Sequence, residues 1–214
     1  MSQSDHQNVE LVWITPNAEQ LITKMARVSN PSNEDNMETA PRLLSYLIKH
    51  KHWSPFELGN MCIKISTERD ISTQILRHRS FTFQEYSSRY SNMPMANVPE
   101  FRRQDLENRQ NSIDDLDDEL IDEMKDKAAV AISHSYNVYQ ELLDKGVAKE
   151  CARRILPLCT PTTLYMNGTI RSWIHYIQLR SSNGTQLEHM EIANKIKAIF
   201  IEQLPFISVA LQWN

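Results

Sequence analysis

Only four glycines occur among the 214 residues of this chain, well below the average usage of about 7%. Glycine supplies the backbone freedom that tight hairpin turns and phosphate-binding loops require, so such turns and loops must be few. Neither G-x-G-x-x-G nor G-x-x-x-x-G-K-[ST] is present, so the sequence supports neither a Rossmann dinucleotide site nor a P-loop.

The composition points to a folded cytoplasmic protein, with 41% hydrophobic and 23% charged residues. No stretch approaches the roughly 20 apolar residues of a membrane span, and residues 1–10 lack the basic and apolar regions of a signal peptide. A net charge of −4 argues against a protein that coats nucleic acid. Three cysteines without a C-x-x-C pair fit reduced thiols, and we expect Cys62, Cys151 and Cys159 to be packing residues.

Hydrophobic periodicity predicts an α+β fold in which helices surround a small, mostly antiparallel sheet, as a single domain over residues 1–214. Residues 80–103 have no clear period and are expected to form a long loop. Asn17 and Thr169 are candidate N-caps, and Gly146 is placed to end a long acidic helix. We expect strands at 9–14, 60–66 and 162–166, and helices at 18–26, 39–50, 71–79, 114–143, 147–156, 170–179 and 187–203.

The densest cluster of polar side chains lies at residues 74–90, which hold three arginines, a histidine, a glutamate and several hydroxyls. Arginine is suited to bidentate capture of phosphate or carboxylate. On a helix Arg77 and Arg79 would point about 200° apart, so they would serve two neighbouring ligands rather than one anion. An equally weighted alternative is that they complement the negative C-terminal end of a helix dipole.

Two further stretches carry arginines. If residues 151–157 form a helical turn, either Arg153 or Arg154 must face inward or toward a partner, although solvation of both is the simpler interpretation. In the helix expected after Thr169, Arg171 and His175 lie one turn apart, and free N–H groups at its start favour an anion. His175 alone is more typical of a hydrogen-bonded core position. His50 and His52 lack a third ligand at suitable spacing, so we expect no metal site.

Together these segments resemble the flavin-dependent thymidylate synthases over roughly residues 10–205. The signature segment is Arg77-His78-Arg79, seven residues, and then Ser87, continuing to Arg89-Tyr90. Four other segments match the family in order and spacing: Ala26–Ser29, His52–Glu57, Ala152-Arg153 with Leu156-Pro157, and Arg171–Trp173 through Arg180. An ordered match of several motifs is far more specific than any one of them.

The resemblance implies reductive methylation of dUMP to dTMP. The carbon donor is 5,10-methylenetetrahydrofolate, FAD is the hydride carrier and NADPH is the reductant. The implied assembly is a homotetramer with active sites at subunit junctions. Its partners are therefore small molecules and copies of itself, without nucleic acid or membrane.

The resemblance also assigns residues. Arg180 matches the catalytic arginine, a fixed cation that stabilises negative charge developing on the pyrimidine. His52 and Tyr90 resemble residues near the folate and the flavin, and Ser87 is read as a positioning hydroxyl because no adjacent base activates it. The dUMP positions are Gln74, Arg77, Glu85, Ser87, Ser88, Arg89, Arg153 and Arg180. The FAD positions are Ser54, Arg77, His78, Arg79, Glu85, Thr169, Ile170, Arg171 and His175.

Three positions depart from some members of the family. Thr169 and His175 stand where some carry asparagine, and Gly184 stands where others carry histidine. Two functions of other classes compete with the synthase. A nucleic-acid-binding module would use the arginines and aromatic residues of 69–103, but the net acidity weighs against it. A metal-dependent nucleotide hydrolase would use His50 and His52, but the ligand spacing does not fit.

Overall fold

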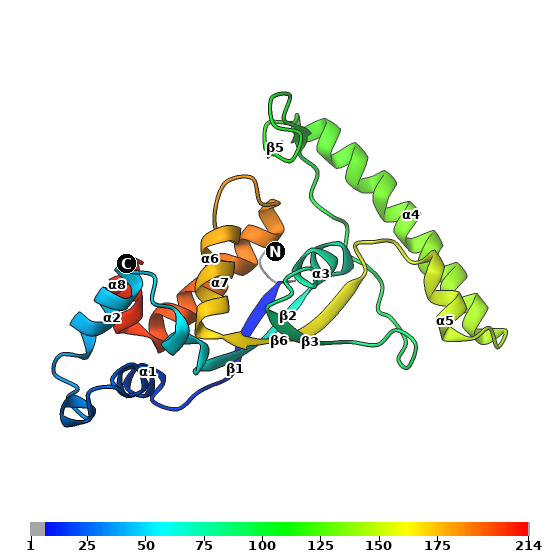
Figure 1. Cartoon of the computed structure of the whole chain (residues 1–214). Coiled ribbons are helices and arrows are strands. Elements are labelled where there is room, and N and C mark those ends of the chain that lie inside the picture. The colour runs from blue at the N-terminus through cyan, green and yellow to red at the C-terminus, as the bar shows by residue number, and fades with distance from the viewer. Residues whose placement is uncertain (1–6, 214) are drawn as a thin grey trace.

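A computed structural model describes residues 7–213. Its main sheet has four antiparallel strands in the order β1-β2-β6-β3 (Figure 1). The α+β fold with a small antiparallel sheet is therefore confirmed. The strands are β1 (Asn8–Ile14), β2 (Asn60–Glu68), β6 (Pro161–Thr169) and β3 (Phe81–Glu85).

Helices make up most of the remaining structure, and a short β4–β5 ribbon joins Arg103–Gln104 to Ser112–Ile113. Among residues 7–213, no helix is long and apolar enough to cross a membrane. The helices are α1 (Ala18–Ala26), α2 (Ala40–Lys49), α3 (Arg69–Ile75), α4 (Asp118–Asp144), α5 (Lys149–Ala152), α6 (Ile170–Arg180), α7 (Leu187–Gln203) and α8 (Pro205–Ala210), with 3-10 turns at Pro31–Asn33, Ser54–Glu57 and Arg153–Ile155.

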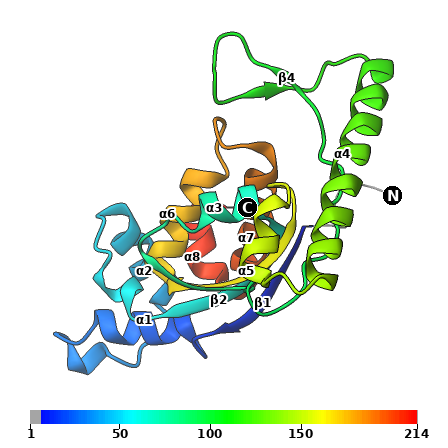
Figure 2. The ribbon, with the colours of Figure 1, turned by 90° about the vertical axis from the view of Figure 1, so that its right-hand side faces the viewer.

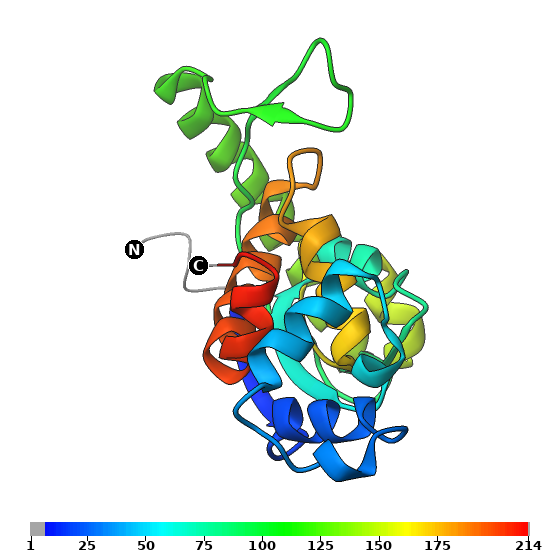
Figure 3. The same cartoon turned by 60° about the vertical axis from the view of Figure 1, so that its left-hand side comes forward.

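The core lies between one face of the sheet and the helices. Because strand side chains alternate between faces, Met61, Ile63 and Ile65 of β2 all point inward, as do Leu164 and Met166 of β6. The helices supply Trp173, Ile177, Ile192, Ile196 and Phe200 to the same core. Figure 3 shows the C-terminal helices grouped with α2 on one side of the molecule, and α2 packs on α8.

The long helix α4 stands apart from this core (Figure 2). Of its side chains, only Ile132 and Tyr139 are buried. The Tyr139 hydroxyl accepts the backbone N–H of Met93 at 3.1 Å and so ties α4 to the loop after β3. Asp117 caps its first turn, and Gly146 follows its end with φ of 80°, as predicted.

The structure corrects four local expectations. Residues 81–85 form strand β3 rather than loop, and α3 ends at Ile75 rather than continuing to residue 79. Arg77 and Arg79 therefore lie in the turn before β3, where the helical 200° argument does not apply. Asn17 precedes α1 in a left-handed conformation and makes no side-chain cap. Cys151 is exposed, so it is not a packing residue.

The close contact between β3 and β6 gives a test of the fold. Gly168 pairs with Phe81, and a Cβ added at Gly168 would lie 2.4 Å from the Phe81 ring. We expect Gly168→Ala to lower the free energy of unfolding by about 1–3 kcal/mol, measured by denaturant titration. Adding Phe81→Leu should relieve the clash, so the double variant should lose less stability than the two single losses combined. An unchanged unfolding midpoint in Gly168→Ala would contradict this packing.

Candidate active site

Two arginines meet at the hydroxyl of Ser88, which is 2% exposed. Arg153 donates to its Oγ at 2.9 Å, and Arg69 donates to the same atom at 3.2 Å. Within residues 7–213, neither guanidinium makes an ion pair with a carboxylate. Since the hydroxyl oxygen accepts from both arginines, its proton is free to donate. Two uncompensated cations around a free O–H donor are suited to a phosphate group.

Next to this anion site, Glu85 is held at the end of β3. One carboxylate oxygen accepts from the Ser72 hydroxyl at 2.7 Å and from the Thr162 hydroxyl at 3.1 Å. These bonds fix the carboxylate between α3 and β6. Its second oxygen has no side-chain partner among the described residues, so it is available to a hydroxyl of a bound ligand.

Arg180, at the end of α6, donates its Nε–H to Nε2 of His78 at 2.9 Å. Burial, together with the nearby charges of Arg180, His175 and Arg77, lowers the pKa of His78 to about 4. The imidazole is therefore neutral at physiological pH and holds Arg180 without cancelling its charge. The His78 ring also meets the Tyr176 ring edge-on at 4.9 Å, which fixes its plane.

Gln74 connects α3 to the N-terminal part of α7. Its amide nitrogen donates to the side-chain oxygen of Gln186 at 2.7 Å, and its oxygen lies 3.4 Å from Nδ1 of His189. His189 is fully buried, and its other ring nitrogen lies 3.0 Å from the Tyr176 hydroxyl. Burial and the charge of Arg180 lower the pKa of His189 to about 3, so this ring is also neutral.

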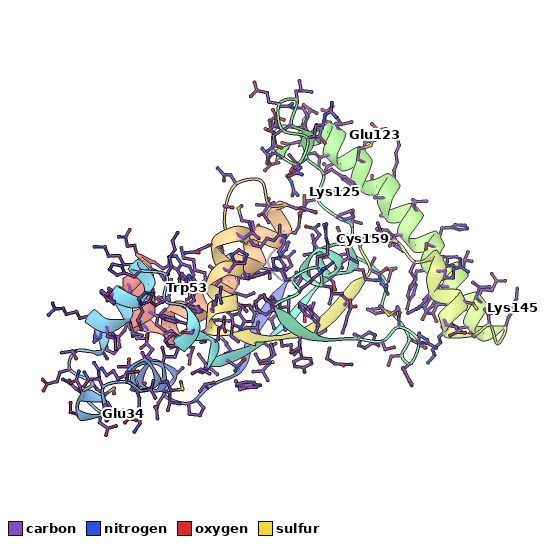
Figure 4. All side chains as sticks on the ribbon, viewed as in Figure 1. Glu34, Trp53, Glu123, Lys125, Lys145 and Cys159 are labelled. Carbon is purple, nitrogen blue, oxygen red and sulfur yellow. The ribbon has the colours of Figure 1, made fainter. Side chains whose placement is uncertain are left out.

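A pocket of about 410 Å³ opens on the outer face of α6, where Arg171 and His175 lie. Trp53 and Glu57 line its other side, and Figure 4 shows Trp53 near α6. Glu57 forms an ion pair with Arg171. His175 is exposed, so the core-histidine interpretation is wrong, whereas the stripe of Arg171 and His175 on one helix face is confirmed.

The remaining predicted site residues are less enclosed. Arg77 and Arg79 are exposed and make no ion pair within residues 7–213. Arg89 pairs with Glu150 at 3.2 Å.

Ile170 is buried in the core and presents no side chain to the pocket on α6. Ser54, His52 and Tyr90 are exposed, Ser87 is half-buried, and Thr169 uses its hydroxyl to accept the backbone N–H of Ser172.

Sequence reasoning missed Arg69, Trp53 and His189. Arg69 is the first residue of α3, and only folding brings it to Ser88, which is 19 positions away. Its position directly after an alternating strand was the available signal, because residues at such junctions often carry binding groups. The prediction that both Arg153 and Arg154 are solvated is wrong, because Arg153 faces inward to Ser88 while only Arg154 is exposed.

The fold and site define an α+β protein with a preformed anion site, an uncompensated arginine and a pocket lined by aromatic side chains on α6, features suited to nucleotide chemistry. Residues 10–206 match the model of the family described as thymidylate synthase complementing protein. The chain is 52% identical to the "Probable flavin-dependent thymidylate synthase" of Paramecium bursaria Chlorella virus 1, covering 92% of this chain and 91% of that protein.

A second relative is the flavin-dependent thymidylate synthase of Synechocystis, at 48% identity over 91% of this chain and 90% of that protein. Among solved structures, the UMP/dUMP methylase PolB from Streptomyces cacaoi, bound with 5-Br dUMP, superposes with a TM-score of 0.85. Its sequence is 26% identical, and the match covers 96% of this chain and 94% of that one. The chain belongs to the thymidylate synthase complementing protein family, that of the flavin-dependent thymidylate synthases.

The convergence on Ser88 gives a test of the anion site. We expect Arg69→Gln to weaken binding of a nucleoside 5′-monophosphate by about 1.5–3 kcal/mol, roughly 10- to 100-fold, because one charge-assisted hydrogen bond is lost. Calorimetric titration with dUMP and with deoxyuridine separates the contribution of the phosphate to binding from that of the nucleoside, since deoxyuridine lacks the phosphate. The exposed Arg42 on α2 supplies the control Arg42→Gln. Equal losses for dUMP and deoxyuridine would contradict a phosphate contact.

Proposed function

We propose that this chain catalyses the reductive methylation of dUMP to dTMP, with 5,10-methylenetetrahydrofolate as carbon donor, FAD as hydride carrier and NADPH as reductant. The family supports the reaction. The observation that carries the proposal in this chain is the convergence of Arg69 and Arg153 on Ser88. We place the enzyme in the cytoplasm, where its small-molecule substrates occur.

The phosphate of dUMP carries nearly two negative charges, and the anion site at Ser88 offers two guanidiniums and one hydroxyl proton to it. In this proposal the second carboxylate oxygen of Glu85, whose first oxygen is held by Ser72 and Thr162, accepts from the sugar hydroxyl. We propose the full dUMP site from these and the family-matched positions: Gln74, Arg77, Glu85, Ser87, Ser88, Arg89, Arg153 and Arg180, with Arg69 added.

Arg180 is the proposed catalytic residue. Methylation at C5 requires negative charge to develop on the uracil ring, and a fixed cation beside the ring lowers the free energy of that state. His78 orients the guanidinium through Nε and leaves its other donors free. A carboxylate in place of the neutral His78 would orient Arg180 equally well, but it would also compensate the charge that the reaction needs.

The residues available for FAD fit its chemistry. Arg77 and Arg79 are exposed and outside any ion pair of the described chain, so they can neutralise a pyrophosphate. Trp53 and His175 line the pocket on α6 and present aromatic surfaces to a planar ring. When bound, FAD supplies the hydride that reduces the transferred carbon. The proposed set is Ser54, Arg77, His78, Arg79, Glu85, Thr169, Ile170, Arg171 and His175, with His52 and Tyr90 near the folate.

A homotetramer with active sites at subunit junctions is the proposed assembly. Helix α4 supports it, because 27 residues of helix bury only two side chains within the chain and leave Leu120 and Val130 exposed. The exposed Arg77 and Arg79 support it too, since guanidiniums on an open surface of one chain can complete a site on another. Assembly would cover both features.

The visible absorption spectrum of the purified protein is the first test of the function. We expect flavin absorption that bleaches with NADPH, followed by dTMP formation when dUMP and methylenetetrahydrofolate are added. Arg180→Ala should retain flavin but lose dTMP formation by about 10²–10³-fold, because transition-state charge is left unstabilised. Arg154→Ala, which removes an exposed arginine, is the matched control. Wild-type turnover in Arg180→Ala would contradict the assigned role.

Light scattering tests the assembly. We expect a mass of about four times the 24.9 kDa of one chain. Val130 of α4 is 71% exposed in the single chain, so Val130→Glu places a charge at the proposed interface and should shift the mass downward. Val28→Glu, at a position 76% exposed beyond α1, should not. A monomeric wild-type protein would refute the tetramer.

A further inference from the structure

Four side chains form a continuous hydrogen-bonded row behind the proposed uracil end of the site. The Tyr176 hydroxyl lies 3.0 Å from Nε2 of His189, whose Nδ1 lies 3.4 Å from Oε1 of Gln74. Nε2 of Gln74 then lies 2.7 Å from Oε1 of Gln186. Tyr176 and His189 are both fully buried, so water cannot substitute for either partner. The row joins α6, α7 and α3.

The bond between the two glutamines fixes the direction of this row. Nε2 of Gln74 donates to Oε1 of Gln186, so the other end of the Gln74 amide, its acceptor oxygen Oε1, faces Nδ1 of His189. His189 consequently carries its proton on Nδ1, and its bare Nε2 accepts from the Tyr176 hydroxyl.

We propose that His189 is a positioning residue that fixes the amide of Gln74 with an N–H, rather than its carbonyl, available to the bound nucleotide. The inference rests on the proposed function, in which Gln74 contacts dUMP. Tyr176 acts on Gln74 only through His189, because its hydroxyl selects the tautomer of the His189 ring. Neither residue needs to touch substrate to have this effect.

The orientation of Gln74 matters because the nucleotide presents mainly acceptors. The phosphate oxygens and both uracil carbonyls accept hydrogen bonds, and a glutamine carbonyl aimed at them would repel them. Gln74 uses one N–H for Gln186 and retains a second. If the His189 tautomer reversed, Nδ1 would become an acceptor, and the Gln74 amide would turn to satisfy it. The donor to the nucleotide would then be lost together with the bond to Gln186.

Steady-state kinetics of the FAD-loaded enzyme, with dUMP varied, test this role. Tyr176→Phe keeps the ring and removes only the hydroxyl, and His189→Leu removes both hydrogen bonds. We expect the KM for dUMP to rise about 5- to 20-fold in each, with kcat at saturating dUMP within about twofold of wild type. His189→Asn can still offer an amide N–H to Gln74 and should recover most of the affinity. Thr23→Val, which removes a buried hydroxyl of α1, controls for a general loss of stability.

Nitrogen-15 NMR of the labelled imidazole provides a readout that does not depend on turnover. At pH 7 we expect His189 in the Nδ1–H form in wild type, and a shift toward the Nε2–H form in Tyr176→Phe. An Nε2–H tautomer in wild type, or an unchanged KM in both Tyr176→Phe and His189→Leu, would overturn the proposal. A wild-type enzyme that forms no dTMP would refute the proposed function instead, so the two failures are distinguishable.

Discussion

The pairing of β2 with β6 is the interaction on which the site depends. Nine residue pairs run from Asn60 opposite Thr169 to Glu68 opposite Pro161. Each strand passes directly into a helix, β2 into α3 and β6 into α6. A slip of one residue would turn the inward-facing side chains to the outer face, so the buried core holds this register firmly. The same register sets where α3 presents Gln74 and where α6 presents Arg180.

The electrostatics of the site follow from what surrounds each arginine. Arg69 and Arg153 meet a hydroxyl, and Arg180 meets a neutral imidazole. In each case the partner orients the guanidinium without neutralising it. Arg69 and Arg153 share one hydroxyl oxygen and so repel each other, and a bound anion would relieve that repulsion. Oriented but uncompensated charge is the condition under which an enzyme stabilises a developing anion without reorganising at the moment of reaction.

Sequence patterns predicted most of the fold because most elements are set by their own periodicity. Helices α1 and α7 begin and end at the predicted residues, and strand β6 covers the predicted 162–166. Strand β3 was missed because its pairing with β6, with the Phe81 ring against Gly168, comes from a segment more than 80 residues away. The site likewise divides into residues that local motifs reveal and contacts that only long-range folding creates. Arginines in motifs could be listed from the sequence, but the contact of Arg69 with Ser88 exists only once the chain is folded.

His189 shows why the second layer of a site escapes sequence reasoning. In the sequence it is one histidine in the first turns of an amphipathic helix, where a core position with a satisfied ring is the ordinary interpretation. The folded chain does bury this ring completely. The sequence does not show that folding places the Tyr176 hydroxyl at one ring nitrogen of His189 and the amide oxygen of Gln74 at the other. These two partners together select the tautomer of the buried ring and so orient Gln74.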